Sequence, residues 1–77
     1  MRRVLVRMSE YVRNNVNELR TKIGMTQEAL AENVGVSRQT IIAIEKGNYS
    51  PSVLLALKIA LLFKRSVEDV FSISHEK

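Results

Sequence analysis

Few residues in this 77-residue sequence can take part in covalent or metal chemistry. There is no Cys, and the single His, His75, lies close to the end of the chain. Zinc sites and nucleophilic triads need several such side chains, so one chain cannot assemble either kind of site. A cofactor site between two subunits has no obvious set of residues either. We therefore expect no enzyme activity, no metal and no cofactor.

The remaining chemistry lies in polar side chains that suit an anionic partner. Twelve Lys and Arg against eight Asp and Glu give a net charge of +4. Arg38 can form two parallel hydrogen bonds with O6 and N7 of guanine, and the adjacent Gln39 can do the same with N6 and N7 of adenine. The charge favours an anionic partner without identifying it, so the partner must be inferred from the positions of these residues in the fold.

Apolar periodicity and capping residues predict five short helices and no repeats, so the expected fold class is all-α. The first helix is predicted over residues 9–23, where Val12, Val16 and Leu19 recur at helical spacing. Ser9 is its predicted N-cap. The later helices are predicted over residues 26–34, 37–46 and 51–63, followed by a short helix that opens at residue 66.

Residues 27–44 have the pattern of two helices joined by a sharp turn. Ala31 is small enough to let the helices approach closely, and Gly35 supplies the turn. Ile41 and Ile44 face inward and wedge the second helix across the first. The N-terminal end of the second helix then projects from the body, where it can enter a DNA major groove.

Three stretches in and around this segment resemble the Cro/cI-type (XRE) helix-turn-helix family. They are Met25-Thr26-Gln27-Glu28, Gly35-Val36-Ser37-Arg38-Gln39-Thr40-Ile41 and Ile44-Glu45-Lys46-Gly47. Together with Tyr49-Ser50-Pro51-Ser52, they are similar to the small stand-alone prokaryotic regulators of that family. The resemblance implies a five-helix lambda-repressor-like DNA-binding domain over residues 9–71. An N-terminal extension of residues 1–8 and a C-terminal tail of residues 72–77 would flank it.

The resemblance also implies that the predicted helix 37–46 is the recognition helix. The side chains that would read bases are Arg38, Gln39, Ile42 and Ala43. The phosphate-binding candidates are Gln27, Thr40, Lys46, Asn48 and Tyr49. Gln27 matches a family position that binds a backbone phosphate at a helix N-terminus, whereas Tyr49 is equally suited to packing over the turn. Exposed polar residues also occur without function, but the motif determines which face is presented, and this favours base reading.

Arg20 and Glu45 match family positions that form an internal ion pair between the first and third helices. Their expected role is structural. Removing one partner of such a pair costs about 3 to 5 kcal/mol when the pair is buried. The resulting unfolding would imitate a loss of DNA contact.

Leu54 and Leu61 stand where relatives usually carry polar residues. Their spacing of seven places them on one face of the predicted helix 51–63, on either side of Lys58, as an exposed apolar strip. A homodimer interface is favoured over an apolar monomer surface, because helix-turn-helix proteins commonly bind two half-sites. Lys64 replaces the Gly that usually ends this helix, so we expect a weaker cap there.

Both ends of the chain carry residues that favour strands. The extension contains Val4, Leu5 and Val6 between arginines, and apolar residues alternate over 70–74. We expect the extension to pair as a strand, either with the C-terminal tail or across a dimer axis, with Val4 and Val6 in the interface. Two alternatives are a basic arm that follows DNA and translation that begins at Met8.

The leading functional hypothesis is a homodimeric, sequence-specific transcriptional regulator, most simply a repressor, that binds a double-stranded DNA operator. The alternative is a protein-interaction module, such as the antitoxin of a toxin–antitoxin pair, whose apolar strip binds a different protein. The most apolar stretch, residues 53–63, is interrupted by Lys58 and is shorter than the ~20 residues needed to span a bilayer. We therefore expect a cytoplasmic, nucleoid-associated prokaryotic protein with no membrane partner.

Overall fold

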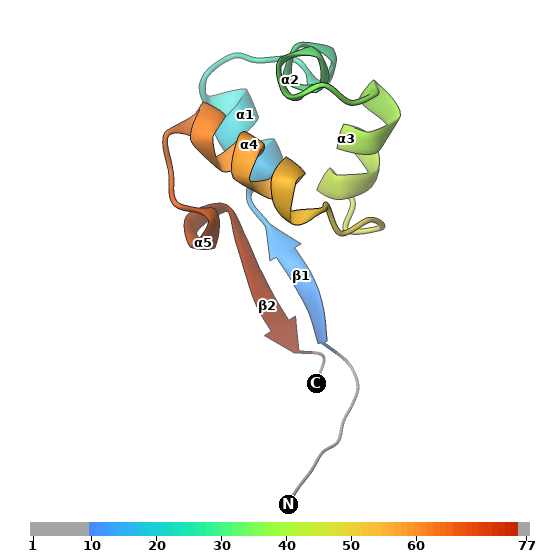
Figure 1. Cartoon of the computed structure of the whole chain (residues 1–77), viewed down its shortest axis with the longest axis vertical. Helices are drawn as coiled ribbons and strands as arrows, with labels where there is room; N and C mark the ends of the chain where they lie inside the picture. The colour runs from blue at the N-terminus through green and yellow to red at the C-terminus, as the bar shows by residue number, and fades with distance from the viewer. Residues whose placement is uncertain (1–9, 76–77) are drawn as a thin grey trace, which may run out of the picture.

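Five helices stand on an antiparallel ribbon of two strands in the computed structural model, which describes residues 10–75 (Figure 1). The ribbon pairs β1 (Glu10–Asn14) with β2 (Phe71–His75) and places Val12 opposite Ile73. The helices between the strands are α1 (Val16–Lys22), α2 (Gln27–Val34), α3 (Arg38–Glu45), α4 (Val53–Phe63) and α5 (Val67–Val70). The predicted five-helix fold, with a short strand paired to the C-terminal tail, is confirmed.

The first helix is shorter than predicted, because residues 10–14 form β1 instead. The spacing of Val12 and Val16 fits a helix, but Val12 lies in the ribbon and pairs with Ile73. The side chain of Asn14 accepts a hydrogen bond from the Val16 amide at 3.0 Å, which favours a helix start at that point. The predicted start near Ser9 is therefore wrong, and Ser9 itself lies outside the described residues.

The strand that pairs with the C-terminal tail is not the one predicted. The partner of β2 is residues 10–14, whereas the sequence pointed to residues 1–8. The strand that the alternation predicted in the tail is present as β2, which begins at Phe71, although Ile73 is 69% exposed. Val4 and Val6 lie outside the described residues.

Side-chain caps determine where the later helices begin. Thr26 caps α2, Ser37 caps α3 and Ser66 caps α5, each by accepting a hydrogen bond from an amide three residues ahead. Ser52 caps α4 in the same way, so this helix starts at Val53 and not at residue 51 as predicted. The N-cap of α4 is therefore Ser52, and Pro51 lies before the helix and not in its first turn.

The turn between α2 and α3 depends on a left-handed residue. Gly35 has a φ of 78° and its amide donates to the Ala31 carbonyl at 2.9 Å. The sequence predicted this conformation, which glycine adopts without the steric cost of a Cβ. The turn brings α2 and α3 together as a compact pair.

Lys64 ends α4 in the same left-handed region, with a φ of 58°, and is the one non-glycine with a positive φ in residues 10–75. We expect Lys64→Gly to raise the free energy of unfolding by about 0.5 to 1 kcal/mol, because glycine relieves the strain. Urea unfolding followed by circular dichroism measures the change. Arg65→Gly is the control, since Arg65 has no positive φ. An equal gain from Arg65→Gly would contradict the explanation.

The core lies between the helices and fixes the orientation of α3. Its buried side chains are Val16, Leu19, Leu30, Ala31, Val34, Ile41, Ile44, Leu55, Ile59, Ala60 and Val70. Ile41 and Ile44 are fully buried, and burial of such side chains stabilises the fold by about 1.5 to 3 kcal/mol each. The opposite face of α3 is therefore held outward.

Candidate nucleic-acid interface

The outer face of α3 is open to solvent at one side of the helical body (Figure 1). Arg38 and Gln39 are exposed, and Ile42 and Ala43 are half-buried beside them. No hydrogen bond or ion pair engages the side chain of Arg38 or Gln39 within the described part of the chain. Their donors and acceptors are thus available to a ligand.

A hollow of about 550 Å³ lies beside the N-terminal ends of α2 and α3. It is lined by Arg20, Thr26, Gln27, Glu28 and Arg38. The hollow brings together a predicted phosphate ligand, Gln27, and a predicted base reader, Arg38. Glu28 also lines the hollow, and its negative charge opposes the positive charges of Arg20 and Arg38 there.

Gln27 takes part in an internal contact that the sequence did not predict. Its Nε2 donates to Glu45 Oε1 at 3.0 Å, and the residue is half-buried. An amide nitrogen carries two hydrogens, so Gln27 can hold Glu45 with one and still offer the other to a phosphate. The position is compatible with both roles.

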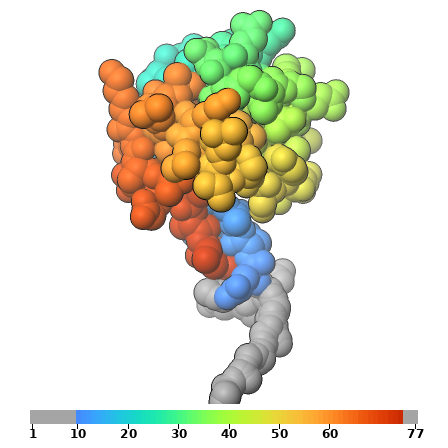
Figure 2. Space-filling model, viewed as in Figure 1, coloured from blue at the N-terminus to red at the C-terminus, as the bar shows by residue number. Residues whose placement is uncertain are grey.

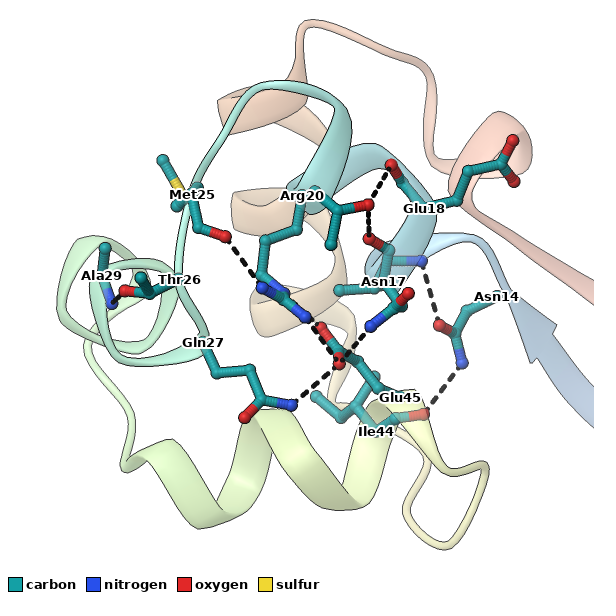
Figure 3. A network of polar contacts seen from close by, with 12 residues as sticks. Asn14, Asn17, Glu18, Arg20, Met25, Thr26, Gln27, Ala29, Ile44 and Glu45 are labelled. Carbon is teal, nitrogen blue, oxygen red and sulfur yellow. Dashed lines mark hydrogen bonds and ion pairs between the residues drawn. The ribbon is translucent and has the colours of Figure 1, made fainter.

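Arg20 and Glu45, the predicted ion pair, are in direct contact (Figure 3). Arg20 Nε donates to Glu45 Oε2 at 2.7 Å, and the two side chains are only 10% and 5% exposed. Arg20 also bonds Glu45 Oε1 at 3.2 Å and the Met25 carbonyl at 2.8 Å. The pair therefore ties α1 to the last residue of α3, and Arg20 also bonds the loop that precedes α2.

Four hydrogen bonds converge on the Glu45 carboxylate. Besides the two from Arg20, it accepts one from Gln27 and one from Asn17 Nδ2 at 3.1 Å. Burial alone would raise the pKa of Glu45. The hydrogen bonds from Arg20, Gln27 and Asn17, together with the charge of Arg20, outweigh burial and hold the pKa below its ordinary value of 4.5. Glu45 is consequently ionised at neutral pH.

The lowered pKa of Glu45 makes folding stability depend on pH. A carboxylate with a depressed folded pKa contributes its full stability above its unfolded pKa, near 4.5, and loses it as pH falls through the folded pKa. We expect the stability difference between the natural chain and Glu45→Gln to shrink below pH 4.5. Urea unfolding at a series of pH values from 7 to 3 measures this difference. A gap that stayed constant to pH 3 would contradict it.

The other phosphate candidates are distributed around α3 and the loop that follows it. Lys46 and Asn48 are exposed, whereas Thr40 is half-buried with its hydroxyl 3.1 Å from Ser37 Oγ. Tyr49 is 48% exposed and lines a second hollow of about 260 Å³ together with Lys58 and Thr40. Both interpretations of Tyr49, phosphate contact and packing over the turn, remain compatible with this position.

Asn14 and Asn17 are polar residues at this site that the sequence analysis missed. Asn17 donates to Glu45, and Asn14 Nδ2 donates to the Ile44 carbonyl at 2.9 Å. Both residues were placed on the predicted first helix, where they resembled ordinary exposed positions. The Asn pair before Val16 is the signal that indicates a helix start here, because Asn is favoured at N-caps.

The predicted apolar strip on α4 is exposed. Leu54 and Leu61 are 63% and 79% exposed, and Val53 and Leu57 extend the same surface. Figure 2 shows α4, in yellow to orange, on the face of the molecule turned to the viewer. An apolar hollow of about 260 Å³ lies beside the strip, between Leu57 and Phe71 of β2. This surface is available to a protein partner.

No cluster of three or more His, Cys, Asp or Glu suited to a metal ion occurs in residues 10–75. Within the same residues, every helix is too short or too polar to cross a bilayer.

A helix-turn-helix family model matches residues 16–70, from the first residue of α1 to the last of α5. The chain belongs to this family. The match includes α2, the Gly35 turn and α3, which confirms the resemblance inferred from the motif. Members of the helix-turn-helix family that resemble this chain are described as transcriptional regulators. The HTH-type regulator YgzD of Bacillus subtilis is 55% identical over 65 residues, 84% of this chain and 98% of that protein.

Further helix-turn-helix relatives come from archaea and from solved structures. An HTH-type regulator of Archaeoglobus fulgidus is 50% identical over 66 residues, 86% of this chain and 94% of that protein. The restriction-modification controller protein C.AhdI of Aeromonas hydrophila has a TM-score of 0.67 at 31% identity, over 71% of this chain and 83% of that chain. The transcriptional regulator VanUg has a TM-score of 0.73 at 26% identity, over 95% and 97%.

Proposed function

We propose that this helix-turn-helix protein is a sequence-specific regulator that binds double-stranded DNA with α3 in the major groove. One observation carries the proposal. Arg38 and Gln39 are exposed, without partners in the described residues, on a helix whose other face is fixed by the buried Ile41 and Ile44. A helix held by one face and polar on the other suits insertion into a groove.

Each outer residue of α3 has a chemical role in this proposal. Arg38 bonds O6 and N7 of a guanine, and Gln39 bonds N6 and N7 of an adenine. Ile42 and Ala43, half-buried beside them, contact thymine methyl groups. Two bidentate contacts and an apolar contact allow several base pairs to be distinguished.

Contacts with the DNA backbone orient α3 in the groove. Gln27 binds a phosphate from the hollow that it shares with Arg38, and the N-terminus of α2 favours an anion there. Thr40, Lys46, Asn48 and Tyr49 supply further phosphate contacts. These contacts carry no sequence information, so their loss weakens binding to all duplexes.

The protein acts as a homodimer in this proposal, with Leu54 and Leu61 in the interface. Their exposure on one side of α4 supports a contact between copies. A two-fold dimer places two recognition helices about 34 to 36 Å apart on a roughly palindromic operator. Covering a promoter in this way represses transcription. We place the protein in the prokaryotic cytoplasm, with the nucleoid.

Selection of duplexes from a random pool tests the proposal. The natural chain should enrich a palindromic motif containing guanine and adenine in each half-site. Enrichment of no motif would contradict sequence-specific binding. Analytical ultracentrifugation of Leu54→Lys tests the dimer, since a buried charge in the strip should shift the protein towards monomer.

Backbone contacts are tested by gel shift with Gln27→Ala. We expect affinity to fall by about fivefold for each half-site on every duplex, since one hydrogen bond contributes about 1 kcal/mol. The matched control is Asn17→Ala, which also removes one hydrogen bond to Glu45 but lies outside the hollow. Equal losses in the two variants would assign the effect to Glu45 and not to a phosphate.

The second candidate function is a protein-interaction module, such as an antitoxin, and the exposed strip on α4 is the observation that favours it. Purification from the native host distinguishes the two. A stoichiometric foreign protein that is lost on Leu61→Lys would support the module. Recovery of a homodimer alone would support the regulator.

A further inference from the structure

Asn14 connects three parts of the molecule with one side chain (Figure 3). It is the last residue of β1, and its backbone is paired with Phe71 of β2. Its Nδ2 donates to the Ile44 carbonyl at 2.9 Å, and its Oδ1 accepts from the Val16 amide at 3.0 Å. Asn14 therefore joins the ribbon to the last turn of α3 and to the first turn of α1.

The neighbouring Asn15 connects the ribbon to a different element. Its amide donates to the Val70 carbonyl at 2.9 Å, and its side chain donates to the Asp69 carbonyl at 3.0 Å. Both acceptors belong to α5, so Asn15 makes no contact with α3 in these bonds. The two asparagines thus make similar hydrogen bonds to different helices, Asn14 to α3 and Asn15 to α5.

The C-terminal turn of α3 is held by side chains from β1 and α1. Asn14 bonds the Ile44 carbonyl, while Asn17 and Arg20 bond the Glu45 carboxylate. Ile44 is fully buried, and Asn14 supplies one of the two hydrogen bonds that its carbonyl accepts; the other comes from the Gly47 amide. Asn14 is the member of this set that reaches the backbone of α3, and a backbone bond constrains the helix axis more directly than a bond to a side chain.

We propose that Asn14 is a positioning residue for base reading, which anchors the C-terminal turn of α3 to the ribbon and thereby sets the direction in which α3 presents Arg38 and Gln39. The proposal rests on the function proposed above. Arg38 and Ile44 are six residues apart, or about 9 Å along a helix. A tilt of about 5° at the anchored end then moves Arg38 by about 0.8 Å, whereas a productive contact tolerates about 0.5 Å.

Asn14→Asp tests this role. Aspartate keeps the acceptor for the Val16 amide but has no donor for the Ile44 carbonyl, which its charge repels. We expect the ratio of affinities for the selected operator and for an unrelated duplex to fall about tenfold, while affinity for the unrelated duplex changes less than twofold. The matched control is Asn15→Asp, which adds the same charge one residue away and removes a donor to α5. Its ratio should stay within twofold of the natural value.

A readout without DNA separates this proposal from the function on which it rests. The Gly47 amide donates to the same Ile44 carbonyl at 3.0 Å. Hydrogen exchange at Gly47 should be about tenfold faster in Asn14→Asp and unchanged in Asn15→Asp. If the natural chain prefers no duplex, the proposed function fails, and Gly47 exchange still decides whether Asn14 anchors α3.

Two results would overturn the role of Asn14. One is a folded Asn14→Asp protein with the natural affinity ratio or with unchanged exchange at Gly47. The other is an equal loss of affinity for both duplexes, which indicates a stability effect alone. If Asn14→Asp does not fold, Asn14→Ser replaces it, because serine can still cap α1 but is too short to reach Ile44. Asn15→Ser is then the control, and the same outcomes apply.

Discussion

We expect Arg20→Ala to lower the free energy of unfolding by about 3 to 5 kcal/mol, because it leaves the Glu45 carboxylate buried without its cation. The Glu45 side chain is only 5% exposed in the intact pair, and after loss of Arg20 it keeps only the two amide donors Gln27 and Asn17. The same substitution also removes the bond to the Met25 carbonyl. Small domains have total stabilities of about 5 to 15 kcal/mol, so this loss removes a large part of the stability of the protein.

A double-mutant cycle distinguishes the ion pair from simple loss of packing. Arg20→Met and Glu45→Leu each leave one charge unpaired, whereas the double variant leaves none. We expect the double variant to be more stable than either single variant in urea unfolding followed by circular dichroism. A loss of less than about 1 kcal/mol for Arg20→Ala, or additive losses in the cycle, would contradict a structural role for the pair.

Arg38→Ala should remove the preference for guanine at one position of each half-site. A bidentate contact contributes about 1 to 3 kcal/mol of discrimination, so affinity falls about 5- to 150-fold for each half-site that loses the contact. Stability should change by less than about 0.5 kcal/mol, because Arg38 is exposed and has no partner in the described residues. Gel shifts on the operator and on a variant with that guanine replaced measure the discrimination.

The control for Arg38→Ala is Arg65→Ala, which removes the same charge from the end of α4, at the opposite side of the helical body from α3 (Figure 1). It should weaken binding slightly and equally on both duplexes. An Arg38→Ala protein that still discriminated guanine would assign base reading to other residues. Since Arg20→Ala and Arg38→Ala both reduce operator binding, unfolding must be measured for each.

The local signals in the sequence were sufficient to predict the α2–turn–α3 unit. Thr26 and Ser37 cap their helices through hydroxyls a few residues from the bonded amides, and Gly35 makes the turn by its own backbone. Such features depend on residues close in the chain, so their positions can be read directly. The inward faces of Ile41 and Ile44 follow from helical periodicity once the helix is located.

The ribbon depends on contacts between residues far apart in the chain, and this is why it was predicted incompletely. Val12 has a spacing that suits a helix and a residue type that suits a strand, and its pairing with Ile73 decides between them. The bond from Asn14 to Ile44 likewise spans 30 residues. No local pattern around Asn14 indicates that its side chain reaches α3.

The central claim, that α3 reads bases in the major groove, is tested most directly by methylation protection at guanine N7. The natural chain should protect at least one guanine in each half-site of the selected operator. Arg38→Ala, at concentrations that saturate the duplex, should lose protection of that guanine and keep protection elsewhere. An unchanged pattern in folded Arg38→Ala, or protection of no guanine by the natural chain, would contradict the claim.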